Sequence, residues 1–266
     1  MSGYLKYFKT EIVMGFQYKA AAISGFFTQV FWGILYCLLY QAFYSYIVID
    51  SISYKELINY VWLMQSFLVL LNIRASNGSL LKSIKDGTVA YELCRPYDLY
   101  NWWYIKIISI KYSGLILRGI PIILLSILLP APFTLTLPVS LEAFILFIIS
   151  LFIGSLLIVS VVMIMYSITF YTLDNKGISS IICSISDLLS GIGIPVPLLP
   201  SIIVTLTYFL PFRLMSDAPF RIYSGNIGII EARYTIMLQI IWLIILIILG
   251  KILIKRALKK ICIQGG

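Results

Sequence analysis

Ser190-Gly-Ile-Gly-Ile-Pro195-Val-Pro-Leu-Leu-Pro200, followed by Leu210-Pro211-Phe212, interrupts an otherwise apolar part of the chain. Proline removes a backbone donor and clashes with the preceding helical turn, and glycine adds conformational freedom. Irregular backbone at membrane depth persists only where protein or a water-filled cavity satisfies its polar groups. A kink that serves packing alone is the alternative. We interpret the break as a gate or hinge formed by Gly191, Gly193, Pro195, Pro197, Pro200, Pro211 and Phe212.

The composition places the chain in the membrane class. Of its 266 residues, 61% are hydrophobic and 12% are charged, and the mean hydropathy is +0.98. Apolar runs of this length can cross a bilayer as helices. We predict an all-α membrane protein of one domain with six transmembrane helices, the fifth of them broken. The predicted spans are Ala21–Tyr46, Leu57–Ile73, Ser113–Leu129, Leu141–Tyr166, Ile178–Phe209 and Thr235–Leu253.

Three segments lie outside these spans. In residues 1–19, Leu5, Phe8, Ile12 and Phe16 recur at helical spacing, which favours a helix lying in the membrane interface over a frayed terminus. Residues 72–112 form a predicted cytoplasmic loop. Residues 200–234 form a predicted outer segment, and no second domain or linker is evident.

The distribution of basic residues predicts the orientation. The net charge of +9 could indicate nucleic-acid binding, but in a polytopic chain it more often marks the cytoplasmic side. Cytoplasmic termini put most lysines and arginines inside. The outer side then holds only Lys55, Arg213, Arg221 and Arg233.

Several kinds of chemistry are excluded. The chain has no histidine, and Cys37, Cys94, Cys183 and Cys262 are far apart, so we expect free thiols, no metal site and no catalytic site. A G-x-x-x-x-G-K-[ST] phosphate loop is absent as well. The energy for any transport must therefore come from an ion gradient or from another polypeptide.

The cytoplasmic loop contains a predicted short helix. Asn77-Gly78 and Asp86-Gly87 are turn signals on either side of it. Leu80, Leu81 and Ile84 give this helix an apolar side. The loop either folds back on its own membrane domain or docks a cytoplasmic partner, and the spacing alone leaves both interpretations open.

Arg118 and Asp187 are ionisable residues inside apolar runs. Such residues usually face the bundle interior, a partner or water. Their distances from the cytoplasmic ends of their spans differ by about one helical turn, so we predict that they form a pair. Alternatively, Arg118 reaches the headgroups and Asp187 faces a polar cavity alone. A lone acid could also serve a gradient-driven carrier.

Several of these segments together resemble one family. The tract Ser190–Pro200 with Leu210-Pro211-Phe212, Pro219 and Tyr223-Ser-Gly225 is similar to the fifth-to-sixth span region of type-2 ABC transporter permeases. Ile84-Lys-Asp-Gly87, Leu93-Cys-Arg95-Pro96 and Ala257–Gly266 resemble a bacterial subgroup of these permeases. The resemblance covers essentially the whole chain.

The resemblance implies a permease subunit of an ATP-driven exporter in a bacterial plasma membrane. It pairs with an identical or homologous permease and carries two separate cytoplasmic ATPase subunits, which bind the ATP and Mg²⁺. The lead Tyr4–Lys19 would be the interfacial connecting helix, and Pro200–Gly225 would form outer helices that dip back into the membrane. The ATPase-coupling element would consist of Ser79, Leu80, Leu81, Lys82, Ile84, Asp86 and Gly87.

The resemblance assigns no substrate-binding residue and no substrate. Two other classes of function stay open. A gradient-driven carrier would use Asp187 and transport without a partner, and a membrane scaffold would bind partners without moving anything.

Overall fold

The computed structural model describes residues 2–17, 19–47, 50–74, 78–172 and 176–259, and the regular structure in these ranges is helical. The long segments are α2 (Lys19–Tyr46), α8 (Leu141–Thr172), α12 (Ile229–Leu258) and a continuous run of α6 (Leu99–Gly114), the π-helical η1 (Leu115–Gly119) and α7 (Ile120–Leu128). The shorter helices are α1 (Ser2–Gly15), α3 (Tyr54–Leu71), α4 (Gly78–Lys85), α5 (Val89–Leu93), α9 (Lys176–Leu189), the 3₁₀ turn η2 (Val196–Leu198), α10 (Ser201–Phe209) and α11 (Asp217–Ser224).

The membrane class predicted from composition agrees with this architecture. Within the described ranges, 4 segments are long and apolar enough to cross a membrane: α2, α6 to α7, α8 and α12. Helices α3 and α9 occupy the other two predicted spans, but they are shorter and are not among these segments. The number of six crossings therefore stays a prediction.

The third predicted span begins earlier than the sequence indicated. Its helix starts at Leu99 rather than at Ser113, so the last third of the predicted loop 72–112 belongs to this helix. Asp98 caps this helix, because its carboxylate accepts a hydrogen bond of 2.8 Å from the backbone N–H of Asn101. The loop proper is therefore confined to the segment that contains α4 and α5.

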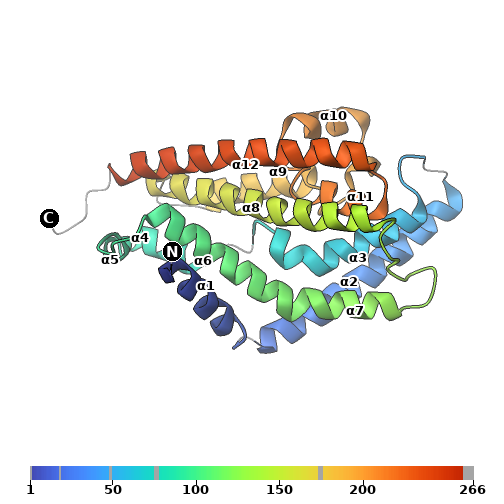
Figure 1. Ribbon diagram of the computed structural model, residues 1–266, viewed down its shortest axis with the longest axis horizontal. Helices are drawn as coiled ribbons and strands as arrows, with labels where there is room; N and C mark the ends of the chain where they lie inside the picture. Colours follow the sequence, from blue (N-terminus) through green and yellow to red (C-terminus); the bar gives the residue numbers. More distant parts are fainter. Residues whose placement is uncertain (1, 18, 48–49, 75–77, 173–175, 260–266) are drawn as a thin grey trace.

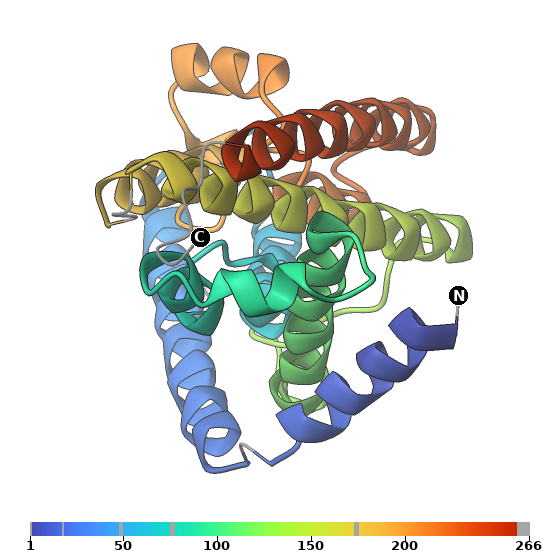
Figure 2. The ribbon, with the colours of Figure 1, turned by 90° about the vertical axis from the view of Figure 1, so that its left-hand side faces the viewer.

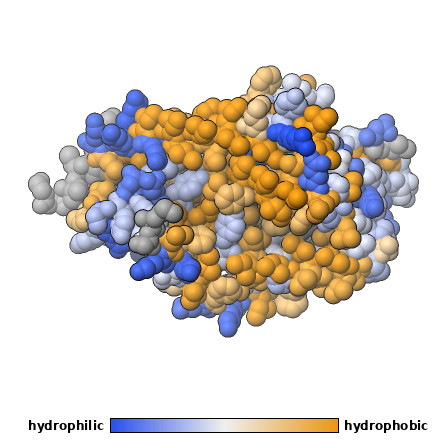
Figure 3. Space-filling model, viewed as in Figure 1, coloured by the Kyte–Doolittle hydropathy of each residue, from blue (hydrophilic) through white to orange (hydrophobic). Residues whose placement is uncertain are grey.

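Helix α3 lies at the centre of the bundle (Figures 1 and 2). It contacts α2, η1, α7 and α11, while α8 and α12 lie side by side along one flank and α1 packs against α6. Apolar side chains cover the middle of the face in Figure 3, and hydrophilic side chains gather toward both ends. This banding is what a hydrocarbon layer between two aqueous phases requires.

Several polar side chains hold the first half of α3 in place. Ser53 and Glu56 form a reciprocal capping box at its first turn. Further along, Asn59 donates to the hydroxyl of Thr136 over 2.8 Å, and the indole of Trp62 donates to the carbonyl of Phe133 over 2.7 Å. The hydrogen bonds of Asn59 and Trp62 fix the position of α3 relative to the segment between α7 and α8.

Glycines allow the closest approaches between elements. A Cβ at Gly154 of α8 would lie 2.5 Å from the backbone oxygen of Met215, in the segment before α11. Backbone cannot move away as a flexible side-chain end can. The outer segment is therefore seated directly on α8.

We expect Gly154→Ala to lower the free energy of unfolding by about 1–3 kcal/mol, because the added methyl group overpacks a backbone contact. Thermal unfolding of the purified protein in detergent measures this loss. Gly177→Ala in α9 is the matched control, since a Cβ there meets nothing within 4 Å. Equal midpoints for the two variants would contradict the close seating of the outer segment on α8.

Candidate functional site

The predicted break in the fifth span is an ordered structure. Helix α9 ends at Leu189, and Gly191 adopts a left-handed conformation with φ of 81°. The hydroxyl of Tyr60 on α3 donates to the Gly191 carbonyl over 3.0 Å, and a Cβ at Gly191 would collide with that hydroxyl. Gly191 therefore marks a turn that only glycine fits. The surroundings of Gly191 do not leave it conformationally free. A hinge role at this position therefore stays a prediction.

A buried carboxylate organises the break. Asp217 is the first residue of α11, and its side chain is fully buried. Its Oδ1 accepts hydrogen bonds of 3.2 Å from the hydroxyl of Tyr60 and from the backbone N–H of Val196, and its Oδ2 lies 3.4 Å from Nη1 of Arg221. One carboxylate thus connects α3, η2 and α11, and we call it the Asp217 hub.

The hub also closes the end of α9. The Ser190 carbonyl accepts hydrogen bonds from the backbone N–H of Asp217 over 3.1 Å and from the hydroxyl of Ser216 over 2.6 Å. Sequence reasoning identified the prolines and glycines here but missed Tyr60 and Asp217. The available signal was Asp217 with Arg221 at i+4, a spacing at which opposite charges meet on a helix.

The remaining predicted gate residues are spread around the hub. Pro195 is buried just before η2, the Pro197 carbonyl accepts from the hydroxyl of Ser51, and Gly193 is exposed. Pro200 caps α10, which stands apart from the bundle in Figures 1 and 2. Pro211 and Phe212 lie on the return path from α10 toward α11.

Arg213, the residue after Phe212, is buried as Asp217 is. Its guanidinium lies 3.9 Å from the centroid of the Tyr208 ring, a cation–π contact. The sequence placed Arg213 on the outer side without assigning it a role. Its aromatic partner on α10 shows that it connects the protruding helix to the hub region.

At the opposite end of the molecule, α4 turns its apolar side inward. Leu80 and Ile84 are buried, Leu81 is half-buried, and the helix packs against α8. The apolar side of α4 therefore agrees with the first of the two interpretations, in which the loop folds back on its own membrane domain. The predicted coupling residues left facing outward are Ser79, Lys82, Asp86 and Gly87.

Helix α5 extends the outward face of α4. Gly87 has a φ of 70° and turns the chain between the two helices. Tyr91 has 78% of its surface exposed, and Leu93 is exposed beside it. We refer to Lys82, Asp86, Gly87, Tyr91 and Leu93 as the α4–α5 surface.

The predicted pair of Arg118 with Asp187 is wrong. Asp187 instead forms an ion pair of 2.8 Å with Arg74, in the segment after α3. Arg118 and Asp187 are each partly exposed, so neither of them is a fully buried charge. The hydrogen bond and charge of Asp187 raise the pKa of Arg74 and keep its guanidinium ionised.

The Arg74 segment is itself anchored. The backbone N–H of Arg74 donates to the Asn72 side chain over 2.7 Å, and the buried ammonium of Lys111 donates to the Asn72 carbonyl over 2.7 Å. A cation at a helix C-terminus is stabilised by the free carbonyls there. The end of α3 is thereby tied to α6 through Lys111 and to α9 through Arg74.

The predicted free thiols agree with the structure for three of the cysteines. Cys37, Cys94 and Cys183 form no disulfide among the described residues. Cys262 lies outside the described residues, as does most of the Ala257–Gly266 motif.

Residues 26–265 match the family described as ABC-2 family transporter protein. The chain belongs to this family. It is therefore a membrane permease of an ABC transporter, and family members are membrane components that do not themselves hydrolyse ATP. The match covers the permease from within α2 to the C-terminal tail and leaves α1 outside. No curated protein is similar enough to the permease to count as a relative.

We expect Asp217→Ala to destabilise the permease by about 3–5 kcal/mol, because it removes the buried carboxylate that the Arg221 guanidinium, with 14% of its side chain exposed, and the N–H of Val196 both contact. Thermal unfolding in detergent tests this loss. Glu142→Ala removes an exposed ion pair with Arg233 and should cost about 0–1 kcal/mol. A loss for Asp217→Ala no larger than that for Glu142→Ala would show that the hub is dispensable.

In a variant lacking the native cysteines, we expect a short bifunctional thiol reagent to link Arg74→Cys to Asp187→Cys, because the two charged groups are in contact. Arg118→Cys with Asp187→Cys is the matched control and should link far less. Mass spectrometry of the digested protein identifies the linked peptides. Preferential linkage of positions 118 and 187 would restore the original pairing.

Proposed function

We propose that this permease is the membrane subunit of an ATP-driven exporter in a bacterial plasma membrane. It pairs with a second permease, identical or homologous, and two separate ATPase subunits bind ATP and Mg²⁺ on its cytoplasmic face. Family membership supports the ABC class, and the points beyond that class are our proposal.

The α4–α5 surface carries the proposal. Two short helices present charged and aromatic side chains outward, while their apolar residues anchor them to the bundle. Tyr91 is an aromatic residue with 78% of its surface exposed. The apolar residues behind this surface are anchored to the bundle, and charged and aromatic side chains are exposed on it. Such a surface suits a rigid contact with a soluble partner.

Charge supports a cytoplasmic location for this end. Lys82 on α4 and Lys255 and Arg256 in the last turn of α12 are exposed. In Figure 1, α4, α5 and the C-terminal part of α12 lie at the same end of the molecule. Basic residues concentrate on cytoplasmic faces, so this orientation puts both termini in the cytoplasm.

The contacts of Arg74 suggest how motion at α4 reaches the break. Gly78, the first residue of α4, is four residues beyond Arg74 in the chain. Arg74 pairs with Asp187, two residues before the end of α9. A shift of α4 caused by ATP binding would therefore act on the last turn of α9 and on the gate residues that follow.

The same contact disfavours the carrier alternative. The carrier alternative assumes a lone acid in the bundle. Asp187 is instead engaged in an ion pair of 2.8 Å with Arg74. We therefore keep the ATP-driven function as the conclusion.

We expect the tagged permease, purified in mild detergent from its native cell, to retain a stoichiometric partner with a phosphate loop and ATPase activity. Lys82→Glu combined with Tyr91→Ala should release the partner, because both side chains lie on the exposed α4–α5 surface. Gel filtration and mass spectrometry of the eluate measure the retained partner.

Lys55→Glu is the matched control, since Lys55 is exposed at the start of α3, toward the opposite end. It should leave the complex intact. A permease that purifies without an ATPase, and that transports under an ion gradient alone, would overturn the proposed function.

A further inference from the structure

Three pockets follow one another along α2 and α3. The first has a volume of about 680 Å³ and extends from the start of α4 and Lys106 to Arg118. The second, of about 450 Å³, shares Val69 and Arg118 with the first. The third, of about 390 Å³, has these residues in common with the second: Thr28, Gln29, Leu68 and Asn72. The pockets therefore form one series, which we call the α2–α3 groove.

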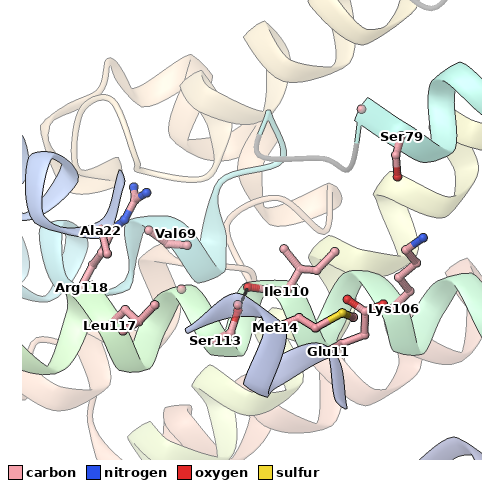
Figure 4. Close-up of a pocket in the computed structure, with 13 residues that line it drawn as sticks. Glu11, Met14, Ala22, Val69, Ser79, Lys106, Ile110, Ser113, Leu117 and Arg118 are labelled. Atoms are coloured by element: carbon pink, nitrogen blue, oxygen red, sulfur yellow. Dashed lines mark hydrogen bonds between the residues drawn. The ribbon is translucent and has the colours of Figure 1, made fainter. Parts of the chain in front are cut away.

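The α2–α3 groove connects the α4 end of the permease with the break after α9. Figure 4 shows its first pocket, with Lys106 and Ser79 at one end and Arg118 at the other. Ser79 is the second residue of α4, on the side to which we assign the cytoplasm. The third pocket reaches Asp187, near the end of α9, and Gly193 in the break. The groove thus leads from the helix of the proposed ATPase contact to a predicted gate residue.

Hydrogen-bonding groups line the groove. Ser24 and Thr28 of α2 line it and are exposed. Gln65 of α3 lines it with 3% of its surface exposed, and its amide has no hydrogen-bond partner among the residues that the structure describes. A buried amide without a partner is costly unless water or a ligand supplies one. A passage for water and polar solutes meets this requirement.

The charges along the groove do not cancel. At the α4 end, Glu11 lies beside Lys106 in Figure 4. At the other end, Asp187 forms its ion pair of 2.8 Å with Arg74. Arg118 lies between these two pairs and has no hydrogen-bond or ion-pair partner in the described part of the chain. The middle of the groove therefore has a net positive charge.

Local structure holds Arg118 against this groove. Arg118 belongs to η1, a single π-helical turn of the kind that is frequent at functional sites. On the facing helix α2, Gly25 leaves room for the guanidinium, because a Cβ there would lie 2.6–2.8 Å from three of its atoms. Thr28 is about one helical turn beyond Gly25 on the same helix. A solute that contacts Thr28 is therefore close to the Arg118 charge.

We propose that the α2–α3 groove is the cytoplasmic entry route of the transported solute and that Arg118 selects water-soluble organic anions there. This role rests on the proposed export function and specifies its class of substrate. A guanidinium without a partner in the protein stabilises a carboxylate, sulfonate or phosphate that reaches it. A cation finds no matching site, since the Asp187 carboxylate is already engaged by Arg74.

Thiol labelling of single-cysteine variants in inside-out membrane vesicles tests the groove without requiring the natural substrate. Each variant lacks the native cysteines. The probes are two membrane-impermeant reagents, anionic sulfonatoethyl methanethiosulfonate and cationic trimethylammonioethyl methanethiosulfonate. We expect Thr28→Cys to react with both, and faster with the anion once each rate is divided by the rate for a free thiol in solution. Ser24→Cys repeats the measurement at a second position of the groove.

Phe27→Cys is the matched control for exposure. Phe27 is the neighbour of Thr28 and has 65% of its surface exposed, but it lines none of the three pockets. Its cysteine should react slowly, because a thiol that faces lipid or a second permease does not form the reactive thiolate. Equal reaction rates at positions 27 and 28 would overturn the entry route.

Arg118→Gln, added to Thr28→Cys, should lower the ratio of the anionic to the cationic rate about tenfold, because a nearby unit charge acts in opposite directions on the two reagents. Lys255→Gln, an exposed lysine in the last turn of α12, should leave this ratio unchanged. An equal effect of the two substitutions would overturn anion selection by Arg118. A co-purifying ATPase would in that case still support the export function, so the two proposals fail separately.

Discussion

The buried carboxylate of Asp217 is the interaction on which the segment from the end of α9 to α11 depends. An unpaired charge in an apolar interior is costly, so the carboxylate must be surrounded by donors. Tyr60, Val196 and Arg221 supply them from three different elements. In the segment after α9, which leaves helical geometry, the hub satisfies the backbone N–H of Val196, and Tyr60 and Ser216 satisfy the carbonyls of Gly191 and Ser190. The prolines make the break unavoidable, and the hub gives it one defined shape.

Helix α3 connects this hub with the opposite end of the molecule. Tyr60 lies near its beginning, and Asn72 follows its last turn. Asn72 is bound by Lys111 of α6, and its neighbour Arg74 binds Asp187 of α9. The last turn of α9, the α4 loop and the gate segment are thus attached to one buried helix. Because both regions contact α3, a displacement at one end of this helix can affect the other end without a continuous path of mobile residues.

Exposed apolar surface has a different meaning on each part of the permease. On α2, α8, α10 and α12 it forms a broad apolar band, which suits contact with lipid or with the second permease proposed above. Tyr91 and Leu93 are exposed on the α4–α5 surface, to which we assign the proposed ATPase contact.

The sequence alone determined the all-α membrane class, the break after Ser190, the short helix at Ser79–Ile84 and the concentration of basic residues at one end. These features are encoded locally, in apolar runs, in prolines and glycines, and in charge. Tertiary structure alone decided that Asp187 pairs with Arg74 rather than Arg118, that Leu80 and Ile84 face inward, and that Asp217 organises the break. Partners of this kind depend on how each helix is rotated and how deep it lies. Packing between residues far apart in the chain sets both quantities, and spacing along one helix does not contain them.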